Sequence, residues 1–560
     1  MPLKVAQYWI SNPFEKKIHG KEGRCLRQNR MRHRIHFLQS GKRANVLKGK
    51  NILDYAKELK IPISSSCGGQ GICKECRIVI EKGCEVLNEK TEPENDLNEN
   101  ERLACQAIIK DDSTDIHIRL SHQGSLEQIA TGGGKKEVEL NPLTRKKNNK
   151  VLFDDKEISS YGNHIYGIAA DIGTTTIVLH LVDLQSGKLI FTSAFENPQR
   201  LIDGNDVISR IMYDRENPAA LYKELISCIN EKISKMPCDK NEIYEMVAVG
   251  NSTMRDMFFG LDVQSIGVKP FKSVTELRGG STFLNKRGSE SSLRINKNAN
   301  IYGAPLIGSH VGADTTAVCL STGLFDESNL TAMAIDIGTN GEIVLRYNHK
   351  IIATSCAAGP ALEPMPALRG AIQRISIDSG KIGWKTIGNT EPMGICGSGI
   401  IDLLGELIKT KVMDKNGYLV NRKVFKITDK VQLTQNAIKG ENGLIWSKAA
   451  ISLGIKVLLQ ETGISTDDLD RVYLAGSFGS YIDKKNARRI GLIPAVPLKK
   501  VVQVGNAAAQ GAKEILLSRE RRRLAEESVK KVKHIDLELI PNYGERLMLD
   551  EQNFKKLKFP

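Results

Sequence analysis

The sequence predicts a small α+β domain followed by a larger α/β domain that is built from two related lobes. Three observations lead to this prediction. Short alternating strands and one helix surround a group of cysteines before residue 121, an apolar strand ending in Asp-Ile-Gly-Thr occurs twice, and the two copies lie 165 residues apart, at Asp171 and Asp336. The length of 560 residues, at roughly 150 residues per domain, allows three or four folding units.

Most of the positive charge lies at the N-terminal end. Of the formal net charge of +15, residues 1–50 carry +11 (13 Lys and Arg against two acids), which leaves +4 for the other 510 residues. A nucleic-acid partner would need charge spread over a folded face, so none is expected. No apolar run reaches the length of a membrane span, and no signal peptide is found, so we expect a cytoplasmic protein with no membrane contact. Residues 1–30 are interpreted as a basic tail or a mis-assigned start.

The small domain is expected over residues 31–121. Residues 33–38 alternate as a strand, a turn follows at Gly41, and residues 43–47 return as a second strand. Asn51 stands where a helix cap belongs, and apolar residues then recur at helical spacing as far as Pro62. Two further strands are predicted around 77–80 and 115–120. Residues 122–160 are rich in Gly, Lys and Asn and lack apolar periodicity, so they are interpreted as a linker.

Four cysteines of the small domain predict a metal centre. Three of them, Cys67, Cys73 and Cys76, form C-x5-C-x2-C, and Cys105 follows after 28 intervening residues. This spacing is one residue longer than the plant-type iron–sulfur pattern and favours one [2Fe-2S] cluster. A tetrahedral zinc site is the alternative, because four thiolates suit zinc equally well, although zinc sites favour paired C-x2-C motifs. Cys84 is interpreted as a bystander.

The two Asp-Ile-Gly-Thr segments predict a phosphate and magnesium site. A carboxylate at the end of a strand can hold Mg²⁺ through water, glycine lets the backbone approach phosphate, and hydroxyl side chains donate hydrogen bonds. The residues concerned are Asp171, Gly173, Thr174, Thr175 and Thr176 in the first copy, and Asp336, Gly338, Thr339 and Asn340 in the second. A third loop after an apolar strand, with Gly476, Ser477, Phe478 and Gly479, offers a flat surface for a nucleotide base, or is an ordinary strand-to-helix turn.

These three loops resemble the two phosphate motifs and the adenosine motif of the superfamily of actin, heat-shock ATPases and sugar kinases. More closely, the chain resembles the ATP-dependent reductive activases of corrinoid enzymes from about Met31 to its C-terminus. The segments that carry this resemblance are 249–262 (VGNSTMRDMFFGLD), 306–324 (LIGSHVGADTTAVCLSTGL), 356–363 (CAAGPALE), 394–405 (GICGSGIIDLLG), 472–493 (VYLAGSFGSYIDKKNARRIGLI) and 504–512 (VGNAAAQGA).

The resemblance implies a ferredoxin-like (β-grasp) fold for residues 31–121 and a two-lobed actin-like (ribonuclease-H-like) ATPase fold for residues 161–560. Lobe 1 is expected over about 161–330, lobe 2 over about 331–520, and a C-terminal segment over 521–560. It further implies that Asp171 and Asp336 position metal or water. Gly397 and Gly399, with Ser398, are either nucleotide contacts or a buried turn, and His310 and Asp314 either face the cleft or cap a helix. Some relatives carry a middle domain, which we expect to be missing here because only about 40 residues separate the two domains.

The implied activity is the ATP-dependent return of cob(II)alamin in a corrinoid methyltransferase protein to cob(I)alamin by one electron. A plant-type cluster has a potential near about −400 mV, and cobalt(I) lies below what it reaches unaided. The implied cofactors are the [2Fe-2S] cluster, ATP and Mg²⁺, and the implied partners are a corrinoid protein, an upstream low-potential electron donor and a second copy in a homodimer. Three alternatives stay open at this point: an ATP-driven electron donor to another low-potential enzyme, a small-molecule kinase of the same superfamily, and a redox sensor or scaffold that binds nucleotide without turning it over.

Overall fold

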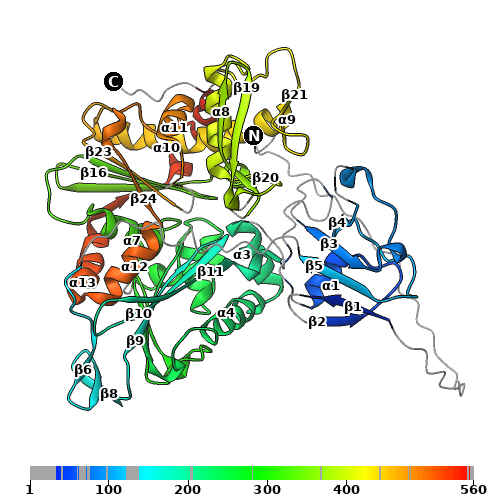
Figure 1. The fold of residues 1–560 in the computed structure, drawn as a ribbon. Coiled ribbons are helices and arrows are strands. Elements are labelled where there is room, and N and C mark those ends of the chain that lie inside the picture. Colours follow the sequence, from blue (N-terminus) through cyan, green and yellow to red (C-terminus); the bar gives the residue numbers. More distant parts are fainter. Residues whose placement is uncertain are drawn as a thin grey trace, which may run out of the picture.

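The computed structural model describes residues 33–38, 42–59, 61, 63, 71, 76–95, 97, 99–120, 138–201, 206–279, 282–365, 367, 369–440, 443–476, 479, 481–551 and 554. The expected basic tail, the first part of the expected linker, and four of the predicted site residues (Cys67, Cys73, Ser477 and Phe478) lie outside the described residues. Figure 1 shows a small N-terminal domain beside two larger lobes.

A mixed five-stranded sheet and one helix form the N-terminal domain. The strand order is β2-β1-β5-β3-β4, with β1 and β5 parallel and the other neighbours antiparallel. Asn51 caps the helix, since its side chain accepts a hydrogen bond from the backbone N–H of Asp54 at 2.8 Å, which confirms the predicted start. The elements are β1 (Arg34–Phe37), β2 (Lys42–Asn45), α1 (Ile52–Glu58), β3 (Arg77–Lys82), β4 (Glu101–Leu103) and β5 (Ile116–Leu120). Of these, only the three-residue β4 was not predicted.

Residues 138–160, which the composition assigns to a linker, are folded. They contain a three-stranded antiparallel sheet, β6 (Thr144–Lys147), β7 (Lys150–Phe153) and β8 (Lys156–Ser160). Val151 is fully buried in a core that both lobes share, and the Thr144 hydroxyl donates to Glu245 of lobe 1 at 2.6 Å. The linker prediction is therefore wrong for this part. The many lysines of the segment are typical of a solvated linker, but a few apolar side chains are enough to anchor the sheet to the protein.

Lobe 1 contains a six-stranded sheet of order β11-β10-β9-β12-β14-β13. Its first three strands form an antiparallel meander, and β12 and β14 continue parallel to β9. The strands are β9 (Tyr166–Ile172), β10 (Thr176–Asp183), β11 (Leu189–Glu196), β12 (Ile243–Val249), β13 (Leu284–Arg287) and β14 (Asn300–Gly303). The helices are α3 (Val207–Glu216), α4 (Ala220–Ile233), α5 (Ser252–Phe258), α6 (Val274–Leu277) and α7 (Ala313–Thr322).

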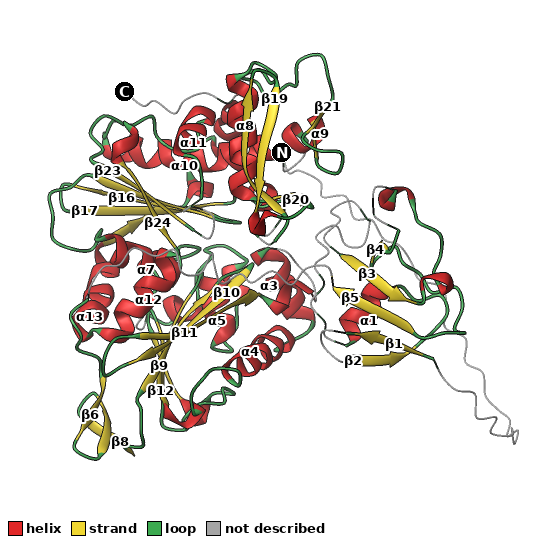
Figure 2. Cartoon of the chain, in the orientation of Figure 1, coloured by secondary structure: helices red, strands yellow, loops and turns green. Residues whose placement is uncertain are grey.

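Lobe 2 repeats this topology, which confirms the internal echo seen in the sequence. Its sheet has the order β24-β23-β15-β16-β17-β25, with an antiparallel meander followed by parallel strands beside β15. The strands of this sheet are β15 (Ala332–Ile337), β16 (Gly341–Tyr347), β17 (Lys350–Cys356), β23 (Arg471–Ala475), β24 (Val501–Gly505) and β25 (Val532–His534). Figure 2 shows helices against both sheets.

Two small sheets and several helices complete lobe 2. The small sheets contain β18 (Ala371–Asp378), β19 (Lys381–Thr386) and β20 (Gly394–Ile395), and the hairpin β21 (Val424–Lys426) and β22 (Gln432–Thr434). The helices in this part of the chain are α8 (Gly397–Lys409), α9 (Gln435–Lys439), α10 (Leu444–Thr462), α11 (Lys484–Ile490) and α14 (Tyr543–Glu551), together with α12 (Ala507–Leu517) and α13 (Arg519–Ser528), which pack against α7 of lobe 1.

The lobe boundaries differ from the expected ones at the C-terminal end. Helix α12 follows a strand of lobe 2, yet it packs against α7, β9 and β12 of lobe 1, and most of its buried residues lie in a core that strands of both lobes share. It packs against α7 so closely that a Cβ at Gly511 would lie 2.1 Å from the carbonyl oxygen of Ala317. The expected C-terminal segment is not separate either, because β25 pairs with β17 in the lobe 2 sheet. The boundary expected near residue 520 is therefore wrong. Helix α12, before it, packs on lobe 1, and β25, after it, belongs to the sheet of lobe 2.

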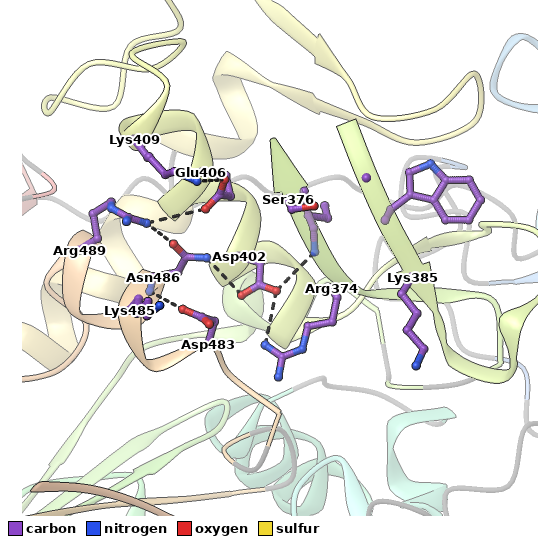
Figure 3. A pocket seen from close by; sticks show the side chains of 13 residues that line it. Arg374, Ser376, Lys385, Asp402, Glu406, Lys409, Asp483, Lys485, Asn486 and Arg489 are labelled. Atoms are coloured by element: carbon purple, nitrogen blue, oxygen red, sulfur yellow. Dashed lines mark hydrogen bonds and ion pairs between the residues drawn. The ribbon is translucent and has the colours of Figure 1, made fainter. Parts of the chain in front are cut away.

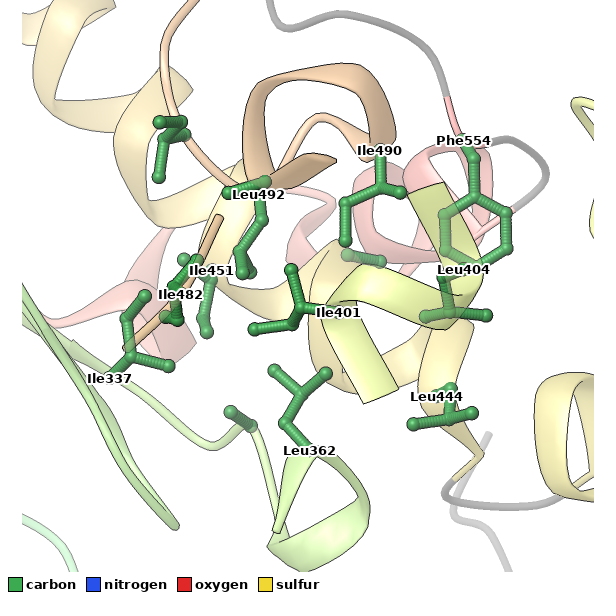
Figure 4. Packing of buried hydrophobic residues seen from close by; sticks show 14 of the residues in the cluster. Ile337, Leu362, Ile401, Leu404, Leu444, Ile451, Ile482, Ile490, Leu492 and Phe554 are labelled. Carbon is green, nitrogen blue, oxygen red and sulfur yellow. The ribbon is translucent and has the colours of Figure 1, made fainter. Parts of the chain in front are cut away.

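The largest apolar core lies in lobe 2. Ile401 and Leu404 of α8 meet Leu444 and Ile451 of α10 in this core, as Figure 4 shows. In the part of the chain that the structure describes, one stretch, 435–462, which contains α9 and α10, is long and apolar enough to cross a membrane. Its most apolar window is 88% buried within the protein, so this stretch is accounted for as the core of lobe 2.

Candidate functional site

A cavity of about 140 Å³ lies where the two lobes meet. Its walls bring together the three loops that the sequence singles out. The predicted residues that line it are Asp171, Gly173, Thr174, Thr175, Thr176, Asp336, Gly338, Thr339, Asn340 and Gly476. Side chains more than 160 positions apart thus share one cavity, because each loop follows a strand that ends at the edge facing the other lobe.

A glycine N–H closes the turn in each of the first two loops, and the first turn is one residue longer than the second. The N–H of Gly173 donates to the carbonyl oxygen of Thr176 at 3.1 Å, and the N–H of Gly338 donates to the carbonyl oxygen of Asn340 at 3.0 Å. A Cβ at Gly173 would lie 2.4 Å from the carbonyl oxygen of Thr176, so only glycine fits this turn. The hydroxyl oxygens of Thr175 and Thr339 lie 3.5 Å apart across the cavity. The two loops therefore meet at their tips, one from each lobe.

The first loop is held by polar side chains of lobe 1. Asn251 donates from Nδ2 to the Thr174 hydroxyl at 2.9 Å, and it also caps α5 by accepting from Met254 N at 2.9 Å. The buried guanidinium of Arg210 on α3 donates to the carbonyl oxygen of Thr174 at 2.5 Å. Burial lowers the pKa of Arg210 to about 9, which leaves the side chain cationic at neutral pH. The loop is thus preorganised before any ligand binds.

Five carboxyl groups line the cavity: Asp171, Asp314, Asp336, Glu342 and Glu363. Burial raises the pKa of Asp171 to about 7, and the nearby carboxylate of Asp314 adds to this shift. Burial and the neighbouring carboxylates raise the pKa of Asp336 to about 8, and burial raises that of Asp314 to about 6. The pKa of Glu342 is also raised well above its usual value, mainly by burial.

This acidic lining fits a bound cation. None of the described residues that line the cavity is Lys, Arg or His, so no side chain there offsets the carboxylates. Clustered carboxylates and hydroxyls are the ligands that Mg²⁺ uses together with water and nucleotide phosphates. The threonine hydroxyls and glycine amides beside them are hydrogen-bond donors suited to phosphate oxygens. The residues present therefore fit Mg²⁺ with a nucleotide.

The third loop lies against the second. Gly476 has φ +98°, and a Cβ there would lie 2.7 Å from Oδ1 of Asp336 and 2.5 Å from the carbonyl oxygen of Ile337. The N–H of Gly479 donates back to the carbonyl oxygen of Gly476 at 3.1 Å. Glycine at position 476 is thus needed so that this loop can approach the carboxylate of the second phosphate loop.

Four polar residues of the cavity were not predicted as site residues: Asn251, Glu342, Glu363 and Asn506. Asn506 donates from Nδ2 to Oδ2 of Asp171 at 3.0 Å. A signal for the two asparagines was present, because each stands in the sequence Val-Gly-Asn between a strand and a helix that it caps. Glu342 carries no such signal, since a lone Glu within an apolar strand is not distinctive. Asp314, one of two uncertain residues, does line the cavity, whereas His310 instead contacts the ring of Phe271.

Gly397 and Gly399 do not line this cavity. A Cβ at Gly399 would lie 2.2 Å from the carbonyl oxygen of Ile372, and the hydroxyl of Ser398 donates to the carbonyl oxygen of Gln373 at 3.0 Å. These contacts seat the start of α8 on β18. The structure thus favours the buried-turn alternative over nucleotide contact, because glycine is required here for close packing of helix and strand.

A larger cavity, of about 750 Å³, lies within lobe 2 between α8, α11 and the β18–β19 hairpin (Figure 3). Charges of both signs line it and are largely paired with each other. A guanidinium nitrogen of Arg374 lies 3.6 Å from Asp402, and Lys409 donates to Glu406 at 2.9 Å. None of the predicted site residues lines this cavity, so its paired charges serve to connect the two helices with the hairpin.

The second candidate centre lies in the N-terminal domain. Pairing of β3 with β4 places Arg77 opposite Leu103, so the turns that contain Cys76 and Cys105 are neighbours. The two sulfur atoms lie 3.3 Å apart, and both residues are buried. Tetrahedral ligands with metal–sulfur bonds of about 2.3 Å would hold their sulfurs about 3.8 Å apart, so this pair is close to ligating distance. The contact with the Cys76 thiol lowers the pKa of Cys105 to about 6, which favours the thiolate that a metal requires.

A buried ion pair fixes the turn that carries Cys105. The carboxylate of Glu94 accepts from Arg102 Nε at 2.9 Å and from the backbone N–H of Leu103 at 2.8 Å. Both charged side chains are almost fully buried. Cys84, in contrast, is exposed on a separate short helical turn. The structure thus brings together the two ligand candidates that it describes.

Comparison with known protein families matches the chain in three consecutive parts. The 2Fe-2S iron–sulfur cluster binding domain matches residues 35–110, the RACo middle region matches 166–327, and the C-terminal domain of RACo, the ASKHA domain, matches 330–558. The matched middle region coincides with lobe 1 and is not an insertion between the ferredoxin-like domain and lobe 1, so the expectation that no such insertion is present stays a prediction. The ferredoxin-like match also decides between the two metals in favour of a [2Fe-2S] cluster, and the ASKHA match agrees with the ATP and Mg²⁺ site.

Similar proteins support the same grouping. The corrinoid activation enzyme RamQ of Eubacterium limosum is 29% identical over 593 aligned positions, which cover 89% of this chain and 95% of RamQ. The [Co(II) methylated amine-specific corrinoid protein] reductase of Methanosarcina barkeri is 25% identical over 64% of this chain and 71% of its own length. The solved structure of a reductive activator for corrinoid, iron–sulfur protein is 28% identical and aligns with a TM-score of 0.67 over 93% of this chain and 98% of that chain. With a cluster domain, a middle region and an ASKHA domain in this order, the chain belongs to the family of reductive activators of corrinoid proteins.

Proposed function

We propose that this protein is an ATP-dependent reductive activator that returns the cob(II)alamin of a corrinoid methyltransferase protein to cob(I)alamin by one-electron transfer. One observation carries this proposal. A single chain holds a buried thiol pair in a ferredoxin-like domain and, between two actin-like lobes, an acidic cavity that fits Mg²⁺ with nucleotide. Relatives that align over most of the chain are named for corrinoid activation, which supports a corrinoid protein as the partner.

The residues divide the work between the two centres. Cys67, Cys73, Cys76 and Cys105 would hold the cluster, which supplies one-electron chemistry when bound. Asp171 and Asp336 would position Mg²⁺ or water, and the hydroxyls of Thr174, Thr175, Thr176 and Thr339, with Asn340, would donate to phosphate oxygens. Gly476, Ser477, Phe478 and Gly479 would border the adenosine. The kinase alternative uses the same nucleotide cavity but leaves the cysteines without a role.

The arrangement of the lobes supports a coupling by closure. Thr175 of lobe 1 and Thr339 of lobe 2 face each other at 3.5 Å, so a phosphate group bound between them contacts both lobes. Helix α12 follows a strand of lobe 2, packs against strands of lobe 1, and lies in a core that both lobes share, so a change in lobe angle would act on it. Nucleotide-dependent closure of this kind would change the surface offered to the corrinoid protein. An upstream low-potential electron donor, a homodimer and a cytoplasmic location complete the proposal.

The test is anaerobic visible spectroscopy of a corrinoid methyltransferase protein in its cobalt(II) state, mixed with this protein after reduction of the cluster. We expect cobalt(I), or methylcobalt when a methyl donor is present, only with ATP and Mg²⁺. An Asp336→Asn variant with an intact cluster spectrum is the matched control and should stay inactive. ATP turnover without any cobalt reduction by several corrinoid partners would favour a different electron acceptor, and a phosphorylated small molecule would favour the kinase.

A further inference from the structure

We propose that the N-terminal domain binds a second, redox-inactive divalent cation, Zn²⁺ or a similar borderline metal, between His36, Asp115 and His117. One donor atom from each of these residues lies within 4.8 Å of a donor atom from each of the others. Imidazole nitrogen and carboxylate oxygen are ordinary zinc ligands, and three protein ligands with one open position form a recurrent zinc site. This site is separate from the cysteines and is independent of the proposed corrinoid activity.

The sheet places the two histidines side by side. Strands β1 and β5 are parallel, and their register pairs His36 with His117, Ile35 with Ile116, and Phe37 with Ile118. The isoleucines and the phenylalanine are buried in the core, so the two imidazoles stand on the opposite face of the sheet. Their ring centroids are 4.8 Å apart with planes tilted by 42°, which leaves the rings free to direct nitrogens toward a common point.

Asp115 is oriented toward this point by the backbone. Its Oδ1 accepts a hydrogen bond from the N–H of Arg34 at 2.8 Å and lies 3.3 Å from Nδ1 of His33. Its Oδ2 lies 3.9 Å from Nε2 of His36. The hydrogen bond to Oδ1 thus fixes the orientation of the carboxylate, and Oδ2 faces the imidazole of His36. Metal sites commonly hold their ligands by such outer hydrogen bonds.

The Nε2 atom of His36 is buried and has no hydrogen-bond partner in the structure. A buried polar atom without a partner is costly, and coordination of a cation would satisfy it. With bonds of about 2.0–2.2 Å, a tetrahedral zinc ion separates its ligand atoms by about 3.4 Å. A shift of roughly half an ångström would therefore bring Nε2 of His36 and Oδ2 of Asp115 to ligating distance.

Two nearby arginines oppose a bound cation, and one of them provides a further test of the proposal. Arg43 stands opposite His36 in the antiparallel register of β1 and β2, and its positive charge acts on the imidazole. Arg34 contributes in the same direction. Removing the Arg43 charge should therefore tighten metal binding several-fold, whereas a purely structural arrangement of these residues predicts no such change.

The experiment measures zinc in the cluster-loaded, full-length protein. Titration against a chromogenic zinc chelator should show one zinc bound per chain with the visible spectrum of the cluster unchanged, and zinc-edge X-ray absorption should show only nitrogen and oxygen ligands at about 2.0 Å. His117→Gln and Asp115→Asn should each weaken binding at least tenfold, Arg43→Ala should strengthen it, and His349→Gln, which alters an exposed histidine of lobe 2, should not change it.

Three results would overturn the proposal. The first is the absence of zinc binding in wild type at micromolar concentrations, and the second is a zinc shell that contains sulfur, which would place the ion at the cysteines. Loss of the cluster spectrum would show that a variant does not fold. If either His117→Gln or Asp115→Asn fails to fold, the other variant still tests the site, because each removes a different ligand. Equal binding by wild type and by whichever variant folds would also reject the site.

Discussion

Asn506 and Asp171, which are 335 positions apart, are joined by a hydrogen bond of 3.0 Å from Nδ2 to Oδ2. The Oδ1 atom of the same asparagine accepts from the backbone N–H of Ala509 at 2.9 Å and so caps α12. One side chain thus connects the first phosphate loop to the helix that crosses between the lobes. Because a hydrogen bond to the charged form favours ionisation, Asn506 also limits the rise in the pKa of Asp171 that burial causes.

Asn506→Ser separates these two roles. Serine caps helices about as well as asparagine, but its short side chain would not reach Asp171. We expect ATP hydrolysis to fall at least tenfold, with a loss of about 1 kcal/mol in the free energy of unfolding for the lost hydrogen bond. Asn506→Ala should lose about 1 kcal/mol more, because the cap is then lost as well. Steady-state ATP hydrolysis and urea unfolding check this, and wild-type hydrolysis by Asn506→Ser would contradict it.

Gly476→Ala should weaken nucleotide binding by displacing Asp336. The new Cβ would lie 2.5 Å from the carbonyl oxygen of Ile337 and 2.7 Å from a carboxylate oxygen of Asp336, at a φ of +98°. Gly463→Ala is the matched control, since that residue has φ +68° but no atom within 4 Å of the new Cβ. Both variants should lose about 1–2 kcal/mol from the positive φ. Only Gly476→Ala should lose tenfold or more in affinity for Mg²⁺-ATP, measured by calorimetry, and equal affinities in the two variants would count against the role of this loop.

The sequence predicts the elements that depend on a few adjacent residues and the topology that recurs in both lobes. The Asp-Ile-Gly-Thr turns, the Asn51 cap and the strands on either side of the cysteines could be predicted because each depends on a few adjacent residues. The same holds for the two-lobed topology, because the apolar pattern of one lobe recurs in the other. The sequence alone therefore predicts that the three loops share one cavity.

What could not be predicted depends on contacts between distant segments. The sequence of α12 does not show that this helix packs against lobe 1, because its small residues would suit a close contact with any helix. The contact with α7 is seen only in the fold, where Gly511 lies against Ala317. The folded segment around Val151 is stable because it packs on a core contributed by other segments. Glu342 becomes a cavity residue because the meander of lobe 2 places it beside Asp336. Each of these features is a property of the assembled fold.

Cys76→Ser and Cys105→Ser should each abolish the cluster without removing ATP hydrolysis. The two sulfurs lie 3.3 Å apart, and a serine hydroxyl does not replace a thiolate that has a lowered pKa. We expect loss of the visible absorption and of bound iron after reconstitution, with ATP turnover within about twofold of wild type. Cys84→Ser, at an exposed position, should keep full iron content. Loss of iron in Cys84→Ser together with its retention in Cys76→Ser would reverse the ligand assignment.

The carboxyl cluster predicts how stability depends on pH. The pKa values of Asp314, Asp171 and Asp336 are raised by burial from 3.8 to about 6, 7 and 8. A carboxyl whose pKa is raised in the folded state favours folding when it is protonated, so this contribution is complete below about pH 4 and is lost as pH rises through these folded-state values. Between pH 5 and pH 8 the nucleotide-free protein should therefore lose stability, by the order of a few kcal/mol at about 1.4 kcal/mol per pKa unit.

Asp336→Asn tests whether the loss of stability with rising pH comes from Asp336 and not from the other titrating groups. The variant removes the carboxyl with the highest of the three raised pKa values, so its urea-unfolding free energy should decline less between pH 5 and pH 8 than that of wild type. Mg²⁺ with ADP should restore wild-type stability most at pH 8, because ionised carboxylates bind the cation while protonated ones do not. The same ligand should restore little in Asp336→Asn. Parallel pH profiles for the two proteins would mean that Asp336 is already ionised in the empty cavity, and that the buried carboxylates are solvated by water in place of a cation.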